Sequence, residues 1–246
     1  MPLVGAATPP PADAAERGLA DLWSRTAPPM AAADRQQFRT AILAMTASWV
    51  WEVANQTQHR IPDPVDYVEM RRKTFGSDLT MTLSRIAEGN ALPPEIFRTR
   101  PMEELNNSAA DCACLINDLF SYRKEIEFEG EFHNCVLVVR HFLGCDAQRA
   151  LDLTGELMAS RMRQFEHVIA AELPVLGADF GLDADARAHL YHYVERLQNW
   201  LSGILNWHRG CRRYPGFVAA AAPDVARVPS GPKGLGTSAA RVRPFV

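Results

Sequence analysis

The sequence lacks any excess of positive charge. Its 26 lysine and arginine residues are outnumbered by 29 aspartate and glutamate residues, which gives a formal net charge of -3. Proteins that bind nucleic acids carry a basic surface, because neutralising phosphates supplies much of the binding free energy. We therefore expect no nucleic-acid partner.

The sequence also lacks long apolar runs. No segment approaches the roughly 20 apolar residues that a helix needs to span a bilayer. The Pro- and Ala-rich start, residues 1–11, has neither the basic nor the apolar region of a signal peptide. We therefore expect a cytoplasmic protein without a membrane span.

Cysteine is scarce and scattered. The five cysteines form no Cys-x-x-Cys pair, and Cys112 and Cys114 stand two positions apart, so they do not share a helix face. The seven histidines show no zinc-ligand spacing either. These absences exclude a disulfide framework and argue against a zinc site. The cysteines are expected to be reduced, mostly buried thiols.

Helical periodicity is what the sequence does have. The chain is 47% hydrophobic and 22% charged, the composition of an ordinary globular protein. Apolar residues recur every three or four positions in three segments, which predicts amphipathic helices. These residues are Phe38, Ile42, Met45, Trp49 and Val53; Met158, Met162, Phe165 and Ile169; and Leu190, Val194, Leu197, Leu201 and Ile204. Strand signals are confined to a short β-branched run, residues 136–139, so the predicted fold class is all-α.

Capping signals predict where one helix ends and the next begins. Asp63 precedes Pro64, which suits an N-cap followed by the first helical residue. Gly76 is expected to end that helix, and Ser77 or Asp78 to cap the next one.

The two ends of the chain differ from its body. Residues 1–14 have no periodicity, and residues 215–246 contain five prolines and four glycines. We predict that both ends are disordered and that residues 15–214 form a helical domain.

The stretch from Cys112 to Glu125 is the most informative one for function. Within it, Asn117, Ser121 and Glu125 are four residues apart, so their side chains share one face of a helix. Amide, hydroxyl and carboxylate oxygens suit Mg²⁺, and the adjacent Lys124 could add a cation for phosphate oxygens. From the spacing alone, a polar stripe on a solvated helix face is the simpler interpretation.

The same stretch resembles a known metal motif. Asn117-Asp-x-x-Ser-x-x-Lys-Glu125 is similar to the second metal motif of class I terpene synthases. The resemblance implies that Asn117, Ser121 and Glu125 hold Mg²⁺ as cofactor. It also implies a lyase with the all-α isoprenoid synthase fold, which acts on a prenyl diphosphate or another small terpenoid.

Residues 60–80 resemble the family's segment that bears the diphosphate-sensing arginine and a helix break. Arg72, four residues before Gly76, fits the sensor best, with Arg71 as the alternative. Residues 74–76 would form the break. Judged without the resemblance, the two arginines are an ordinary surface pair before a glycine C-cap.

Near the end of the predicted domain, Arg213 and Tyr214 resemble the family's closing Arg-Tyr pair. The resemblance implies that they bind diphosphate, together with Arg72 and Lys124. Cations in the last turn of a helix also complement its dipole, which is the alternative explanation for Arg213.

The resemblance further implies that some tryptophans stabilise carbocations, although core packing is their ordinary role. The tryptophans on apolar helix faces are Trp49, Trp51, Trp200 and Trp207.

Four segments resemble one group of enzymes within this family. Residues 15–26, 71–80, 124–134 and 161–167 together look like the C-terminal domain of germacradienol/geosmin synthases, with 2-methylisoborneol synthases as the weaker match. That domain converts germacradienol to geosmin and acetone. The resemblance covers roughly residues 15–214 and assigns no general acid.

One departure from the family pattern limits the expected activity. The family's first metal motif is rich in aspartate and lies upstream of the Leu-Trp-x-Arg-Thr element, which here begins at Leu22, and no Asp-Asp pair occurs in this sequence. We therefore expect an N-terminally truncated fold that lacks the first helices, weak or no activity, and self-association through uncovered apolar residues. The alternative is a non-catalytic remnant that binds a terpenoid or a partner chain.

Overall fold

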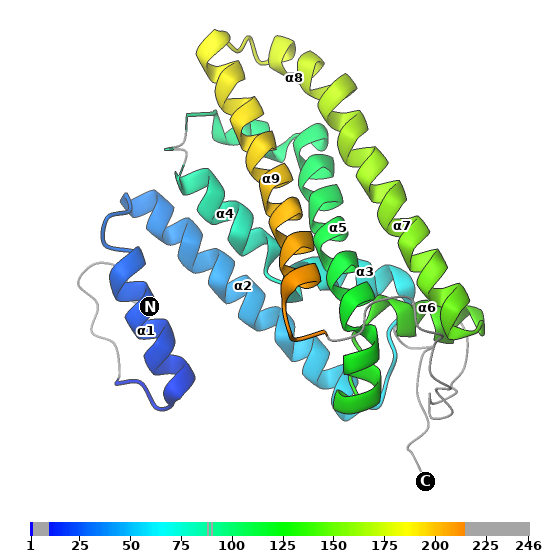
Figure 1. Cartoon of the computed structure of the whole chain (residues 1–246). Coiled ribbons are helices and arrows are strands. Elements are labelled where there is room, and N and C mark those ends of the chain that lie inside the picture. The colour runs from blue at the N-terminus through cyan, green and yellow to red at the C-terminus, as the bar shows by residue number, and fades with distance from the viewer. Residues whose placement is uncertain (2–9, 88, 90, 215–246) are drawn as a thin grey trace.

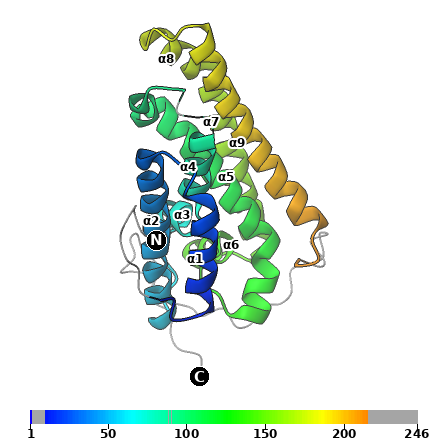
Figure 2. The ribbon, with the colours of Figure 1, turned by 90° about the vertical axis from the view of Figure 1, so that its left-hand side faces the viewer.

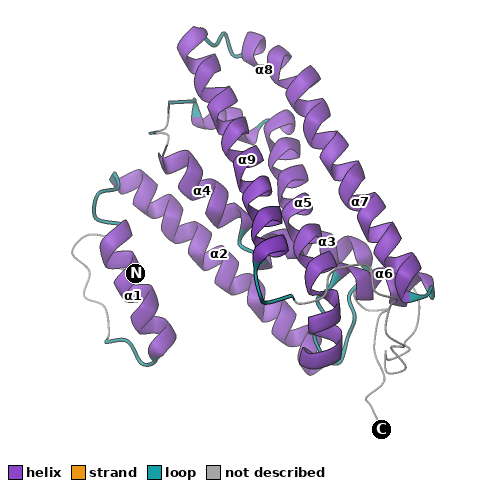
Figure 3. Ribbon diagram, in the orientation of Figure 1, coloured by secondary structure: helices purple, strands orange, loops and turns teal. Residues whose placement is uncertain are grey.

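The computed structural model describes residues 1, 10–87, 89 and 91–214. Helices account for most of these residues, and this part of the chain contains no strand (Figure 3). The prediction of an all-α fold is therefore confirmed. Most of the two ends predicted to be disordered, residues 2–9 and 215–246, lies outside the described residues.

The helices follow one another with short connections. In chain order they are α1 (Ala14–Thr26), α2 (Ala32–Thr57), α3 (Pro64–Thr74), α4 (Ser77–Ala87), η1 (Pro94–Arg98), α5 (Arg100–Lys124), η2 (Glu125–Glu129), α6 (Cys135–Leu143), α7 (Ala147–His167), η3 (Val168–Glu172), α8 (Leu173–Asp179) and α9 (Ala184–Gly210). Segment η1 is a 3₁₀ turn, whereas η2 and η3 are π-helical. None of the helices in the described part of the chain is long and apolar enough to cross a membrane.

Helix α5 lies at the centre of the bundle. It packs against α7 on one side and α9 on the other, and also against α3 and α6 (Figure 1). Helix α2 packs on α3 and α4, which separate it from α5. A view turned by 90° accordingly shows α2 and α9 on opposite sides of the bundle (Figure 2). The side chains of α5 therefore face several other helices.

Apolar side chains fill three parts of the core. One cluster joins α4, α5, α7 and α9, and a second joins α3, α5, α6 and α7. A smaller one holds α1 against α2, where Trp23 stacks on Phe38 with ring centroids 5.5 Å apart. The β-branched run 136–139 lies in α6, where Val136 and Val138 are buried.

The boundary between α3 and α4 has Asp63 and Gly76 in the predicted roles, but α4 already begins at Ser77, so neither Ser77 nor Asp78 precedes the helix as a cap. Asp63 caps α3, because its carboxylate accepts from the Val65 backbone N–H at 2.9 Å, and Pro64 opens the helix. Gly76 has a φ of 80° and separates the two helices. A Cβ at this position would also lie 2.8 Å from Met45 Sδ, so both the backbone conformation and the space favour glycine.

The predicted apolar face of α2 is only half covered. Phe38 and Ile42 are buried against α1 and α4, whereas Trp49 and Val53 are 44% and 63% exposed. The last turns of α2 thus present apolar side chains to solvent. This result agrees with the expectation that part of the face is uncovered.

Candidate functional site

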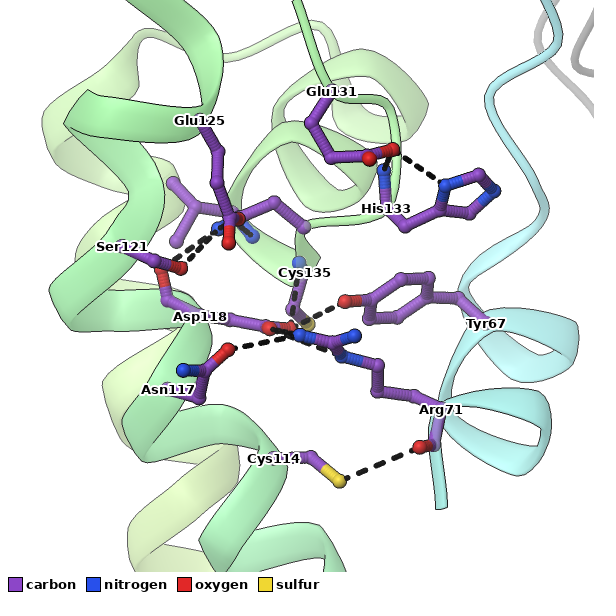
Figure 4. A network of polar contacts seen from close by, with 12 residues as sticks. Tyr67, Arg71, Cys114, Asn117, Asp118, Ser121, Glu125, Glu131, His133 and Cys135 are labelled. Carbon is purple, nitrogen blue, oxygen red and sulfur yellow. Dashed lines mark hydrogen bonds and ion pairs between the residues drawn. The ribbon is translucent and has the colours of Figure 1, made fainter. Parts of the chain in front are cut away.

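The three predicted metal ligands lie where α5 passes into η2. Asn117 and Ser121 belong to α5, and Glu125 opens η2, which ends at the left-handed Gly130. Figure 4 shows their side chains on the same side of the helix. Ser121 is 0% exposed, and Asn117 and Glu125 are half-buried. This face of the helix is therefore not a solvated polar stripe.

Glu125 holds its carboxylate in a poorly solvated position. The Asn134 side-chain amide donates to Glu125 Oε2 at 2.9 Å, and the Ser121 hydroxyl also hydrogen-bonds this carboxylate. Burial raises the pKa of Glu125, and repulsion from the Asp118 carboxylate raises it further. A bound cation would stabilise the charged form of Glu125.

Asn134 connects the predicted ligands to the start of α6. Its Nδ2 atom lies 2.8 Å from the Asp118 carbonyl oxygen and 3.4 Å from Ser121 Oγ. Its Oδ1 atom caps α6 by accepting from the Val136 backbone N–H at 3.0 Å. These contacts with the triad were not predicted. The one available signal was an asparagine directly before an apolar run, which is typical of an N-cap.

Asp118 is a fully buried anion that joins three helices. It accepts from the Tyr67 hydroxyl at 2.5 Å, from Arg71 Nη2 at 2.9 Å and from the Cys135 backbone N–H at 3.0 Å. Burial and the Asp118 charge both raise the pKa of Tyr67, although the nearby Arg71 opposes them. This network was also missed in the sequence. The signal was the four-residue spacing of Tyr67 and Arg71, which puts both on one face of α3.

The two consecutive arginines of α3 reach different parts of α5. Arg71 Nη2 lies 2.9 Å from Asn117 Oδ1. Arg72 instead pairs with Asp111, with Arg72 Nε 2.6 Å from Asp111 Oδ1, and Arg161 lies on the other side of that carboxylate at 2.8 Å. The arginine in contact with the triad is therefore Arg71, the alternative, and not the favoured Arg72. Neighbouring residues on a helix point about 100° apart, so only one of them can face the triad.

A pocket of about 530 Å³ opens beside the triad. Its walls combine apolar and polar side chains. The lining residues are Phe75, Asn117, Glu125, Trp200, Gly203, Ile204, Trp207, His208, Arg213 and Tyr214. Two of the three predicted ligands and the predicted Arg-Tyr pair thus meet at one cavity, although they come from distant parts of the sequence.

Arg213 and Tyr214 follow α9 and reach back to the triad. The Asn117 side-chain N–H points to the Tyr214 hydroxyl at 3.5 Å, and the Arg213 guanidinium lies 5.8 Å from the centre of the Tyr214 ring. Lys124, in contrast, forms an ion pair with Glu129 and is not among the residues that line the pocket. Of the four predicted diphosphate-binding residues, Arg213 and Tyr214 therefore line the pocket, whereas Arg72 and Lys124 do not.

His208 is a further polar residue of this pocket. Its Nε2 atom lies 3.0 Å from Asn117 Nδ2, and its Nδ1 atom lies 2.8 Å from the Ile204 carbonyl oxygen. The ring stacks on Tyr214 with centroids 5.3 Å apart and an interplanar angle of 5°. Burial lowers the pKa of His208 and so favours the neutral ring.

A model of the family described as terpene synthase family 2, C-terminal metal binding, matches residues 1–164 of this chain. The matched region includes α3, the triad and Asn134. The chain belongs to the terpene synthase family.

Curated relatives of this terpene synthase chain come from bacteria and fungi. Pristinol synthase from Streptomyces pristinaespiralis is 30% identical over 235 residues, which cover 92% of this chain and 63% of the relative. (-)-Delta-cadinene synthase from Streptomyces clavuligerus is 32% identical over 200 residues, which cover 80% and 60%. The chain thus spans about 60% of the length of these relatives.

Solved terpene synthases share the fold. The chain is similar to an a-eudesmol synthase with a TM-score of 0.72 at 22% identity, over 85% of this chain and 66% of that one. It is also similar to a linalool/nerolidol synthase from Streptomyces clavuligerus, in complex with 2-fluorogeranyl diphosphate. There the TM-score is 0.73 at 22% identity, over 83% of this chain and 68% of that one. These likenesses establish the helical fold of the terpene synthase chain.

The residues present fit the divalent metal that this terpene synthase family implies. The described part of the chain contains no group of three His, Cys, Asp or Glu side chains that could hold a metal ion. The triad instead offers hard oxygen donors with one carboxylate, a set that suits Mg²⁺ with some of its waters retained. Glu125, whose pKa is raised mainly by burial, is a carboxylate that such a cation would stabilise.

Proposed function

We propose that this chain forms the metal-binding and diphosphate-binding part of a class I terpene synthase active site. In this proposal Asn117, Ser121 and Glu125 hold Mg²⁺. The observation that carries it is the contact between Asn117 and Tyr214, which are 97 residues apart in sequence yet line the same pocket. Two hard-oxygen donors of the triad, the Arg-Tyr pair and apolar side chains line this one cavity, and binding of a prenyl diphosphate requires such a combination.

The diphosphate would lie beside the polar side chains of the pocket. Bound Mg²⁺ would neutralise the diphosphate charge and so assist its departure from the prenyl carbon. Arg213 and Tyr214 would donate hydrogen bonds to diphosphate oxygens, and charge-assisted bonds of this kind contribute about 1.5–3 kcal/mol each.

Arg71 takes the position of the diphosphate sensor in this proposal. Its guanidinium contacts Asn117, whereas that of Arg72 is bound to the buried Asp111. Lys124 would have to leave Glu129 before it could reach a diphosphate. We therefore rank the three basic residues Arg71, Lys124, Arg72 by their expected contribution to diphosphate affinity.

The prenyl chain would lie along the apolar wall. Phe75, Trp200, Ile204 and Trp207 line this part of the pocket. Such a wall excludes water from a carbocation, and aromatic faces attract positive charge. Trp200 and Trp207, rather than Trp49 and Trp51, are accordingly the tryptophans expected to contact an intermediate.

A more specific part of the proposal concerns the substrate and its products. The four segments that resemble germacradienol/geosmin synthases support chemistry on germacradienol, with geosmin and acetone as products. The curated relatives are named for other products, among them pristinol and (-)-delta-cadinene. A sesquiterpenoid or its diphosphate precursor is the substrate class common to both lines of support.

Calorimetry tests the proposed metal site directly. We expect Mg²⁺ to bind the 246-residue protein in the presence of inorganic diphosphate, and to bind weakly without it. Glu125→Gln should abolish the heat of Mg²⁺ binding, because it replaces the only charged ligand of the triad. Glu156→Gln is the control: it changes an exposed carboxylate on α7, which does not line the pocket, and should leave Mg²⁺ binding unchanged.

The same titrations separate the proposal from its alternative. A non-catalytic remnant that binds a terpenoid would bind germacradienol equally well with and without Mg²⁺, and Glu125→Gln would leave that binding unchanged. Equal Mg²⁺ binding by the wild type and Glu125→Gln would overturn the metal assignment.

A further inference from the structure

The amide of Asn117 has two different ends, and only one of them can bind a metal ion. Its Oδ1 atom carries lone pairs, whereas Nδ2 carries two hydrogens and would repel a cation. A rotation of the amide by 180° exchanges the two ends with little change in shape. The proposed metal site therefore depends on what fixes the orientation of this amide.

The contacts of His208 fix one end of the amide. The Ile204 carbonyl oxygen can only accept a hydrogen bond, so the His208 Nδ1 atom 2.8 Å away carries the hydrogen. In the neutral ring Nε2 is then an acceptor. The Asn117 atom that lies 3.0 Å from Nε2 must therefore be the donor Nδ2.

A contact on the opposite side of the amide leads to the same orientation. Arg71 Nη2 can only donate, so the Asn117 atom 2.9 Å away must be Oδ1. Two neighbours on different helices, His208 on α9 and Arg71 on α3, thus assign the same orientation independently.

The imidazole of His208 is itself held in place. The side chain is only 4% exposed, and aromatic rings contact it on several sides. Trp207 lies edge-on with ring centroids 4.8 Å apart, Phe120 is tilted at 5.3 Å and Tyr214 stacks on the ring at 5.3 Å. These ring contacts and the hydrogen bond from Nδ1 to the Ile204 carbonyl oxygen oppose rotation of the imidazole away from Asn117.

We propose that His208 is a positioning residue for the metal site, which holds Asn117 with Oδ1 available to Mg²⁺. This inference rests on the proposed function, because it presumes that Asn117 is a ligand. His208 acts through Asn117 and is not itself a ligand, since its Nε2 lone pair is used by the amide. Partners that orient metal ligands typically change metal affinity by about 10–100-fold when they are removed.

A double-mutant cycle tests the proposal. Mn²⁺ affinity is measured by electron paramagnetic resonance of the free ion, with inorganic diphosphate present, in the 246-residue protein. Arg71 also contacts Asn117 Oδ1, but in the proposed function it binds the diphosphate, so His208→Phe should weaken Mn²⁺ binding by about 10-fold or more. In the Asn117→Asp background it should cause no loss, because the two oxygens of a carboxylate are equivalent and have no wrong orientation. His192→Phe, an exposed histidine on the same helix, is the matched control and should leave the affinity unchanged.

The possible outcomes are distinct. Loss only in the Asn117 background supports the proposal, whereas equal loss in both backgrounds would mean that His208 acts through packing and would overturn it. Should His208→Phe fail to fold, as judged by circular dichroism, His208→Gln replaces it. Glutamine keeps an acceptor, so the proposal predicts affinity within about 3-fold of wild type, and a loss of about 10-fold would overturn it. Absence of Mn²⁺ binding by the wild type would overturn the proposed metal site itself.

Discussion

Arg71 Nη2 lies 2.9 Å from Asn117 Oδ1, so a cation of α3 already touches the amide that we propose as a metal ligand on α5. The same nitrogen lies 2.9 Å from Asp118 Oδ1. Burial alone would lower the pKa of the Arg71 guanidinium, but Tyr67 and Asp118 raise it well above its usual value. Arg71 is thus a fixed positive charge at the edge of the proposed diphosphate site.

Arg71→Ala is expected to weaken diphosphate binding, whereas Arg72→Ala is not. Arg71 lies against Asn117, and a charge-assisted hydrogen bond from it to diphosphate would contribute about 1.5–3 kcal/mol. Arg72 is bound to Asp111, which keeps Arg161 as a second partner when Arg72 is removed. Calorimetry with inorganic diphosphate and Mg²⁺ measures both variants. A loss in Arg72→Ala alone would favour Arg72 as the sensor.

Asp118→Asn is expected to destabilise the fold strongly. Asp118 is 0% exposed, and its carboxylate pairs with Arg71 and accepts from Tyr67 and Cys135. Removing one partner of a buried ion pair typically costs about 3–5 kcal/mol, and Arg71 would keep only the more distant Glu52 carboxylate, at 3.8 Å. Urea unfolding followed by circular dichroism measures the free energy of unfolding.

Asp152→Asn provides the control for this measurement. Asp152 is an exposed carboxylate on α7 that is hydrogen-bonded by Gln148, so its replacement should change the free energy of unfolding by less than about 0.5 kcal/mol. Similar losses in Asp118→Asn and Asp152→Asn would mean that the buried network contributes no more than a surface contact.

The helical architecture was predictable because its signals are local. Apolar spacing and the caps at Asp63 and Gly76 depend on residues close in sequence, and the structure has them as predicted. The triad could also be found locally, since its three residues occupy one helix face.

The partners of the triad could not be found in this way. The choice between Arg71 and Arg72 depends on the rotation of α3 about its axis relative to α5, which is set by tertiary packing. Asn134 and His208 reach the triad from elements that follow it in sequence, His208 from 91 residues beyond Asn117. The local spacing of apolar and polar residues in the sequence does not indicate such contacts. The resemblance to a known family indicated Arg213 and Tyr214, but it assigned no role to Asn134 or His208.

Glu131 is expected to make the stability of the fold depend on pH. It accepts from His133 Nδ1 at 2.6 Å and from two backbone N–H groups. Burial alone would raise the pKa of Glu131, but the hydrogen bonds and the charge of His133 outweigh burial and lower it to about 2. Because the folded-state pKa lies below the ordinary value of 4.5, the stabilisation is present above that pH and is lost as the pH falls toward 2.

Unfolding of the wild type and Glu131→Gln at several pH values measures this effect. The wild type should be the more stable protein near neutral pH, and its advantage should shrink as the pH is lowered from about 5.5 to about 3.5. An advantage that stays constant over this range would show that the ionisation of Glu131 does not contribute to stability.

The uncovered face of α2 is expected to cause self-association. Val50 and Val53 are 69% and 63% exposed, and the nearby Leu43 and Trp49 are also exposed. An apolar patch of this kind promotes association in water. Sedimentation velocity should show oligomers of the wild type that the double variant Val50→Glu, Val53→Glu reduces. Val175→Glu, which changes an exposed valine on α8, should not reduce them.

The 246-residue chain by itself is expected not to turn over farnesyl diphosphate, and to convert germacradienol poorly or not at all. In the family it resembles, diphosphate is bound by metal ions held from two opposed motifs, and no Asp-Asp pair occurs in this sequence. The triad alone would leave part of the leaving-group charge without compensation. Loss of a single electrostatic stabiliser typically costs about 10²–10³ in rate. Purified protein incubated with each substrate and Mg²⁺, followed by gas chromatography–mass spectrometry of the volatiles, measures turnover. Geosmin or germacradienol formed at the rate of a full-length family member would contradict this prediction. It would mean that residues of this chain replace the aspartate-rich motif, and turnover by Glu125→Gln would then show whether the triad is required.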